Sequence, residues 1–145
     1  SATDYMNAKV WQGLGMEHWG NWMQSAPFAG ETGGCCISAS IRDYARLGIF
    51  VKKGAVNATG ESLVPEGWMK EATSPSKGYA GYGYKWWLEG DGAYAASGIF
   101  GQGIYIDPQR DVVISLHSNA PAAVDTNYHA HADAVIKAIA ASFDR

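Results

Sequence analysis

The segment from Gly81 to Asn119 constrains the fold more than any other part of the chain. It alternates short runs of aromatic and β-branched residues with turn-forming residues, a pattern typical of successive β-strands. Glu89-Gly90-Asp91-Gly92 predicts one turn, and Asp107-Pro108-Gln109-Arg110 predicts a type I turn with proline at its second position. The last run, VVISL at residues 112–116, is almost entirely apolar, which predicts a strand buried on both faces. We therefore expect three or four antiparallel strands here, with YGYKWWL at 82–88 and AYAASGIF at 93–100 among them.

Helical patterns lie on both sides of this segment. Residues 2–12 have an apolar helical face, and Pro65 suits the first turn of a short helix. Ser40, with Asp43 three residues later, predicts another helix start, because the hydroxyl accepts a backbone N–H and the carboxylate favours the positive end of the helix dipole. From about residue 127 to residue 143 an apolar stripe recurs at helical spacing. It consists of Ala132, Val135, Ile136, Ile139 and Phe143.

These patterns together predict an α+β fold. We expect an antiparallel sheet of three to four strands, a C-terminal helix packed on it, and a helical, loop-rich N-terminal half. The length suits a single domain over residues 1–145, with a helical and loop-rich part in 1–80 and the sheet and C-terminal helix in 81–145.

The composition excludes several classes of function. Apolar residues make up 47% of the chain and charged residues 17%, which is typical of a globular protein. The net charge of -3 argues against a nucleic-acid partner, because such partners require a basic face. No apolar run approaches the roughly 20 residues that span a bilayer, so we expect no membrane partner.

The cysteines and histidines do not form a metal-binding pattern. Cys35 and Cys36 are adjacent, and neighbours on a strand point to opposite faces, so we expect one or both to be small buried apolar residues rather than partners in a disulfide. Two adjacent cysteines without further ligands at the right spacing do not make a zinc site. His129 and His131, two residues apart, do not share a helical face. We therefore expect no metal and no cofactor.

Four segments, in order, resemble the β-lactamase-like serine hydrolases, a family that includes class C β-lactamases, penicillin-binding-protein-like esterases and 6-aminohexanoate-dimer hydrolases. These segments are VWQGLGMEH at 10–18, GGCCISASIRDYARLG at 33–48, YGYKWWL at 82–88 and GQGIYIDPQRDVVISLHSN at 101–119. The resemblance implies the C-terminal part of a β-lactamase/transpeptidase-like fold. The order of SGIFGQ and IYIDP is most similar to the nylon-oligomer hydrolase and esterase branch.

The resemblance also implies an acyl-transfer site of three parts. A serine attacks with a lysine three residues later, a tyrosine acts as acid or base, and a Lys-Thr-Gly or His-x-Gly strand flanks the substrate. Only the third part has a counterpart here: Ala96-Ser97-Gly98 occupies that position, and Ile99 would donate its backbone N–H to the oxyanion. Because Ala96 lacks the cation that holds a β-lactam carboxylate, neutral esters or amides are expected. The expected substrate-binding residues are Ala96, Ser97, Gly98, Phe100 and Gln102.

The attacking part of such a site is missing from the sequence. SPSK, at residues 74–77, is a formal Ser-x-x-Lys match, but Pro75 and the neighbouring glycines predict a loop instead of the helix start that would present a nucleophile. No Gly-x-Ser-x-Gly elbow occurs either.

Two functions therefore remain open. The chain is either the C-terminal portion of a serine hydrolase, inactive alone, or a binding and assembly module that retains the scaffold without the chemistry. A sheet without its family neighbours would expose an edge and an apolar face. The expected partners are a second copy of the chain or the missing N-terminal half, with a small ester or amide as ligand if the site is completed.

Overall fold

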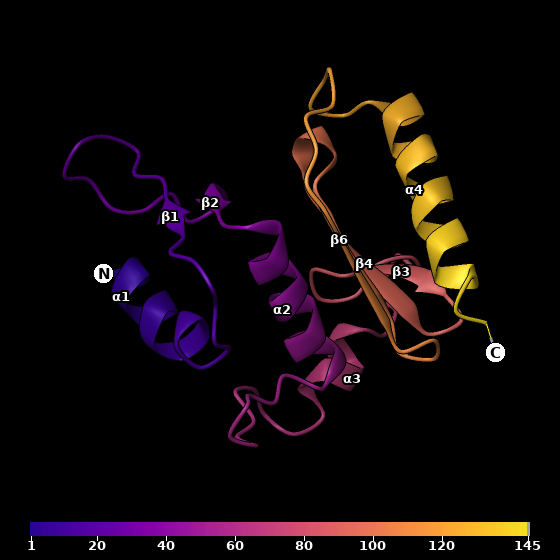
Figure 1. Cartoon of the computed structure of the whole chain (residues 1–145), viewed down its shortest axis with the longest axis horizontal. Helices are drawn as coiled ribbons and strands as arrows, with labels where there is room; N and C mark the ends of the chain where they lie inside the picture. Colours follow the sequence, from indigo (N-terminus) through magenta and orange to yellow (C-terminus); the bar gives the residue numbers. More distant parts are fainter. Residues whose placement is uncertain (145) are drawn as a thin grey trace.

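The computed structural model describes residues 1–144, and its elements follow the predicted order from helical N-terminal half to sheet to C-terminal helix (Figure 1). The helical segments are α1 (Ala2–Met6), the π-helical η1 (Asn7–Trp11), α2 (Ile41–Lys52), α3 (Trp68–Ala72), the 3-10 turn η2 (Ile99–Gly101) and α4 (Thr126–Ala141). The strands are β1 (Asn21–Trp22), β2 (Ile37–Ser38), β3 (Trp87–Gly90), β4 (Ala93–Ser97), β5 (Gly103–Asp107) and β6 (Val112–Leu116).

A four-stranded antiparallel sheet in the order β3-β4-β5-β6 forms the centre of the fold. Each strand pairs with the next one in sequence, so short turns suffice to connect them. The predicted turns lie at Asp91-Gly92 and at 108–111. In the second turn the buried carboxylate of Asp107 accepts hydrogen bonds from the backbone N–H groups of Gln109 and Arg110. The strand order and these turns confirm the predicted antiparallel sheet and the two predicted turns.

The two faces of the sheet are covered by different helices. On one face α2 packs over a core of Val51, Tyr94, Ile104 and Ile106. On the other face α4 lies over Ala93 and Tyr105, with Ala140 as its buried contact. Because side chains alternate along a strand, neighbouring residues of β4 and β5 serve opposite cores. The predicted α+β fold with a C-terminal helix on the sheet is therefore confirmed.

Helix α2 approaches the sheet closely because Gly48 has no side chain. A Cβ added there would lie 2.5 Å from Cγ1 of Val113 and 2.8 Å from Cγ2 of Ile104. The helix begins as predicted: Ser40 is the N-cap, and its side chain accepts the N–H of Asp43.

The N-terminal segment is fastened to α2 through Asp43. Its carboxylate accepts hydrogen bonds from the backbone N–H groups of Glu17 and His18, at 2.7 and 3.2 Å, and from the hydroxyl of Ser40 at 2.8 Å. Arg42 and Arg46 in turn donate to the Glu17 carboxylate. The carboxylate of Asp43 therefore connects the chain after η1 to the first turn of α2.

Two local predictions were wrong. The strand expected over residues 82–88 begins only at Trp87, because Lys85 has a φ of 68° and the N–H of Tyr84 bonds to the carbonyl of Ala72 in α3. Cys35 and Cys36 are exposed and joined by a disulfide. They lie in a turn before β2, where Cys36 has a φ of 79°, so the opposite-face argument for strand residues does not apply.

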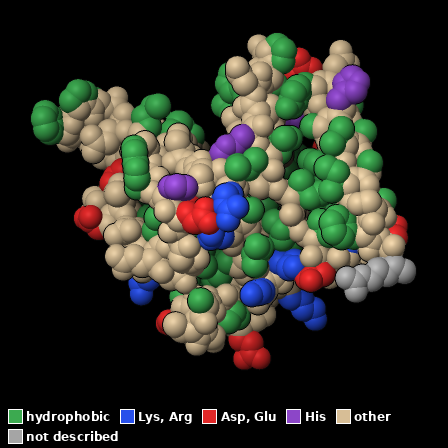
Figure 2. Space-filling view, in the orientation of Figure 1, with side chains coloured by type: hydrophobic (Ala, Val, Ile, Leu, Met, Phe, Trp, Pro, Cys, Tyr) green, Lys and Arg blue, Asp and Glu red, His purple; other side chains and the backbone are tan. Residues whose placement is uncertain are grey.

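The surface carries several exposed hydrophobic side chains. Figure 2 shows them at the tip of the loop between β1 and β2 and over the part of the molecule that contains α4. Among the helices of residues 1–144, none has the length and apolar character required to cross a membrane.

Candidate active-site segment

The segment after β4 forms a tight turn instead of the continuous strand predicted through Phe100. Gly98 is extended, and its N–H donates to the carbonyl of Gln102 at 2.8 Å, closing the β4–β5 ladder. The chain then turns through η2, where Phe100 has a φ of 62° and Gly101 a φ of 85°. Ile99 therefore begins a 3-10 turn rather than continuing the strand.

Hydrogen bonds on both sides hold this turn in place. The N–H of Phe100 donates to the carbonyl of Ala123 at 3.0 Å, and the N–H of Ala120 donates to the carbonyl of Phe100 at 3.1 Å. Within residues 1–144 the N–H of Ile99 has no hydrogen-bond partner, and its side chain is 62% exposed. The result is an unpaired backbone donor in a turn whose neighbouring residues are fixed.

Gly101 is required by this packing. A Cβ added there would lie 2.4 Å from Cε1 of Tyr128 in α4 and 2.9 Å from Oγ of Ser118. A positive φ also favours glycine, which lacks the steric penalty of a side chain. The hydroxyl of Ser118 is buried without a hydrogen-bond partner inside the described chain. The turn thus lies directly against the start of α4.

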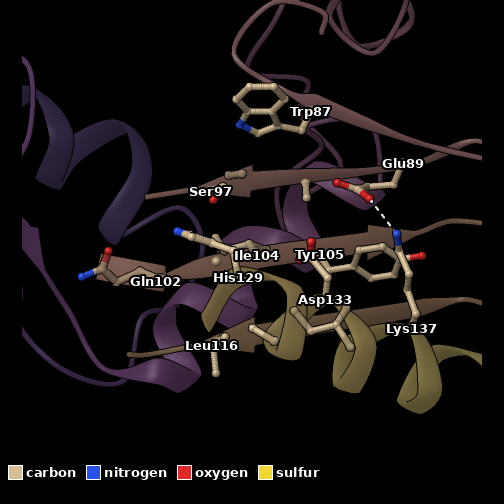
Figure 3. Close-up of a pocket in the computed structure, with 16 residues that line it drawn as sticks. Trp87, Glu89, Ser97, Gln102, Ile104, Tyr105, Leu116, His129, Asp133 and Lys137 are labelled. Atoms are coloured by element: carbon tan, nitrogen blue, oxygen red, sulfur yellow. Dashed lines mark ion pairs between the residues drawn. The ribbon is translucent and has the colours of Figure 1, made fainter. Parts of the chain in front are cut away.

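A cavity of about 180 Å³ lies between the sheet and α4 (Figure 3). Ala96, Ser97 and Gln102 line it, whereas Gly98, Ile99 and Phe100 do not. The predicted residues are therefore divided between the cavity and the η2 turn. The side chains of Ala96 and Ser97 also lie on opposite faces of the sheet. Ala96 pairs with Ile104 on the α2 face, and Ser97 pairs with Gly103 on the α4 face.

Several lining residues were missed by sequence reasoning. Glu89 of β3 and Lys137 of α4 form an ion pair at 3.4 Å across one end of the cavity, as Figure 3 shows. The recurrence of polar residues every four positions along α4 was the available signal for a polar face. Burial, with the charge of Asp107 adding to it, raises the pKa of Tyr105. His129 and Asp133 are two further lining residues that sequence reasoning missed.

The formal Ser-x-x-Lys match does not form a nucleophile site. SPSK follows the end of α3 in a loop, as predicted, and the hydroxyl of Ser74 donates to the carbonyl of Lys70 at 2.6 Å. A serine nucleophile needs a base that accepts this proton, and a carbonyl cannot act as one. Across residues 1–144, no three His, Cys, Asp or Glu side chains are grouped to hold a metal ion.

Comparison with known proteins identifies the family to which this chain belongs. The chain belongs to the beta-lactamase family, because the sequence profile of that family matches residues 1–138. It is 26% identical over 123 residues to a 6-aminohexanoate-dimer hydrolase from Paenarthrobacter ureafaciens, a match that covers 74% of this chain and 31% of the relative. This family assignment confirms the predicted resemblance to β-lactamase-like hydrolases.

A solved structure shares the fold. It is assigned as a 6-aminohexanoate-dimer hydrolase from Bacillus anthracis, and it superposes with a TM-score of 0.78 at 22% identity. The match covers 94% of this chain and 37% of that structure. The chain therefore spans about a third of the length of the relatives it matches.

Proposed function

We propose that these residues form the C-terminal portion of a serine hydrolase that acts on esters or amides, and that they are inactive alone. In this proposal the chain contributes the oxyanion donor and one wall of the substrate site. The nucleophilic serine and its lysine come from a segment outside this sequence. Membership of the β-lactamase family supports the hydrolase class.

The unpaired N–H of Ile99 is the observation that carries the proposal. Acyl transfer places negative charge on the carbonyl oxygen in the transition state, and a fixed N–H donor stabilises that charge without rearrangement. The bonds from Phe100 to Ala123 and from Ala120 to Phe100 supply the required rigidity. Ile99 is itself exposed, so we expect a substrate carbonyl to reach this donor.

The neighbouring residues favour a neutral substrate. Ala96 precedes Ser97 at the end of β4 and has no charge with which to bind a carboxylate. Both matched relatives are named for hydrolysis of the 6-aminohexanoate dimer, which favours an amide over a β-lactam. We place Ser97, Gly98, Phe100 and Gln102 around the substrate, with Gln102 available to hydrogen-bond its amide group.

The test is made on the natural gene product, first by its intact mass. We expect a product larger than 15.5 kDa that includes a Ser-x-x-Lys helix and hydrolyses p-nitrophenyl esters. In that enzyme Ile99→Pro removes the N–H donor, and kcat should fall about 10²–10³-fold, as for the loss of other oxyanion donors. Gly98 has a φ of -105° and a ψ of 160°, which a following proline accepts, so the turn should persist.

Ile99→Val is the matched control, because it retains the N–H while shortening the side chain. Its kcat should stay within a few-fold of the wild-type value. An unchanged kcat in Ile99→Pro, or a natural product of 15.5 kDa, would reject the oxyanion role.

The second candidate is a binding or assembly module without hydrolase chemistry. The open edge of β6 favours it, since an unpaired strand can bind another strand. A natural product that has the mass of this chain and forms complexes without hydrolysing esters would favour this candidate over the first.

A further inference from the structure

The first turn of α4 lies against the turn that contains Ile99. Asp125 is the N-cap of α4, and its side chain accepts the backbone N–H of Tyr128 at 2.9 Å. This cap fixes the start of the helix and places Tyr128 in its first turn. From there α4 contacts η2, the turn formed by residues 99–101. The backbone of Tyr128 is therefore fixed by the helix, independently of the turn that it meets.

The ring of Tyr128 fills the space beside Gly101, the last residue of η2. A Cβ added to Gly101 would lie 2.4 Å from Cε1 of this ring and 2.9 Å from its Cδ1. No Cβ fits at such distances, so the edge of the ring lies directly against the backbone of Gly101. The ring therefore blocks any movement of the turn toward α4.

Phe100, the central residue of η2, has a backbone conformation that its neighbours must maintain. Its φ is 62°, a left-handed value that is unfavourable for a residue with a large side chain. Such conformations persist only where the surrounding structure holds them. The N–H of Phe100 donates to Ala123 and its carbonyl accepts from Ala120, so both hydrogen bonds come from the segment that leads into α4. These bonds and the Tyr128 ring thus hold η2 against the same end of the helix.

We propose that Tyr128 is a positioning residue for the oxyanion donor at Ile99, an inference that rests on the proposed function. The ring blocks movement of Gly101, which keeps Phe100 in its left-handed conformation and so fixes the direction of the Ile99 N–H. An oxyanion donor stabilises the transition state because it needs no rearrangement during the reaction. Tyr128 does not contact the substrate in this arrangement, and its hydroxyl has no part in it.

Kinetics of the natural gene product that contains this chain test the role of the ring. Tyr128→Ala removes Cδ1 and Cε1, and kcat for a p-nitrophenyl ester should fall about 10- to 100-fold, as expected for a donor misplaced by about 1 Å. KM should stay within about two-fold, because an oxyanion donor acts in the transition state and not on the bound substrate. Tyr128→Phe keeps both ring atoms and lacks only the hydroxyl, so its kcat should stay within about two-fold of the wild-type value.

A double-mutant cycle with Ile99→Pro separates positioning from a general effect on the fold. Ile99→Pro has no N–H donor left to position, so adding Tyr128→Ala should lower its kcat no further. In Ile99→Val, which keeps the N–H, Tyr128→Ala should lower kcat by the same factor as in the wild type. A general loss of stability would instead lower kcat equally in all three backgrounds.

Amide hydrogen exchange tests the contact without any assay of hydrolysis. The N–H groups of Phe100 and Ala120 form the two hydrogen bonds of the turn, so Tyr128→Ala should speed their exchange about 10-fold or more, whereas Tyr128→Phe should not. The amide of Ile106, which is buried in the sheet, should exchange as slowly as in the wild type if the variant is folded. If Tyr128→Ala unfolds, Tyr128→Leu removes Cε1 while keeping an apolar side chain of high helix propensity, and it provides the same test.

Four outcomes would overturn the positioning role and leave the proposed hydrolase function intact. The first is a wild-type kcat in Tyr128→Ala although Ile99→Pro lowers kcat, and the second is an equal effect of Tyr128→Ala with and without Ile99→Pro. The third is a loss of kcat in Tyr128→Phe as large as that in Tyr128→Ala, and the fourth is unchanged exchange of the Phe100 and Ala120 amides in Tyr128→Ala. An unchanged kcat in Ile99→Pro, or a natural product without hydrolase activity, would reject the proposed function and the positioning role with it.

Discussion

Asp43 is a buried carboxylate whose charge is balanced by local hydrogen bonds. Burial alone would raise its pKa. The N–H groups of Glu17 and His18, the hydroxyl of Ser40 and the charge of Arg46 outweigh burial, so the pKa of Asp43 lies below its usual value. A lowered pKa in the folded state means that ionised Asp43 stabilises the fold.

Replacing Asp43 with asparagine should lower the free energy of unfolding by about 2–3 kcal/mol at neutral pH, because charged hydrogen bonds are lost in a buried site. The stabilisation by Asp43 is complete above about pH 4, near the usual Asp pKa. It is lost as pH falls through the lower pKa of the folded state. Urea unfolding across this range should therefore show a smaller acid-dependent loss of stability in Asp43→Asn than in the wild type.

The exposed Asp133 provides the control for this prediction. Asp133→Asn should change the free energy of unfolding by no more than about 0.5 kcal/mol. Equal effects of the two substitutions would mean that Asp43 does not fasten the N-terminal segment to α2.

Single residues show where sequence reasoning succeeds and where it ends. Ser40 as the cap of α2 follows from a local pattern and was predicted correctly. The hydrogen bonds from the backbone N–H groups of Glu17 and His18 to the Asp43 carboxylate were not predicted, because they join segments that are distant in sequence. The role of Ile99 as an oxyanion donor stays a prediction from the family resemblance, and a periodicity pattern could not show that the turn at Ile99 is tethered to residues 120–123.

The position of α2 against the sheet depends on the absence of a side chain at Gly48. Glycine inside a helix costs about 1 kcal/mol relative to alanine, so Gly48→Ala should stabilise an isolated helix. In the folded chain the new Cβ would lie 2.5 Å from Val113 and 2.8 Å from Ile104. The clash requires the helix to move or the core to rearrange, at a cost of about 1–3 kcal/mol.

We therefore expect Gly48→Ala to lower the free energy of unfolding by about 1–2 kcal/mol, since overpacking outweighs the gain in helix propensity. Chemical denaturation measures this difference. In the double-mutant cycle, Val113→Ala should reduce the cost of Gly48→Ala, because it removes the Cγ1 atom that the new Cβ meets. A net increase in stability in the single variant would show that α2 does not depend on close approach at this position.

The accuracy of strand prediction followed the strength of the local signals. The turn at 108–111 and the strands on both sides of it were predicted correctly, because proline and a capping Asp107 define that connection locally. The start of β3 was misplaced because residues 82–86 are as aromatic as a strand, but the N–H of Tyr84 bonds to Ala72 of α3 instead. Aromatic composition alone does not distinguish these two environments.

At the scale of the whole molecule, the chain contains a sheet with a helix on each face, yet only about a third of the length of its relatives. Family membership was predictable because four motifs occur in order over most of the chain. The expected partners, a second copy of the chain or the missing N-terminal half, stay predictions, and so does the separate segment to which the proposed function assigns the nucleophile.

The most direct test of the account is a pre-steady-state assay of this chain with p-nitrophenyl esters and nitrocefin. We predict no hydrolysis above a heat-denatured control, because the hydroxyl of Ser74 donates to a carbonyl in a loop and no other serine begins a Ser-x-x-Lys sequence. Ser74→Ala should behave identically to the wild type. A burst of one equivalent of nitrophenol that Ser74→Ala abolishes would contradict the account, because the chain would then contain its own nucleophile.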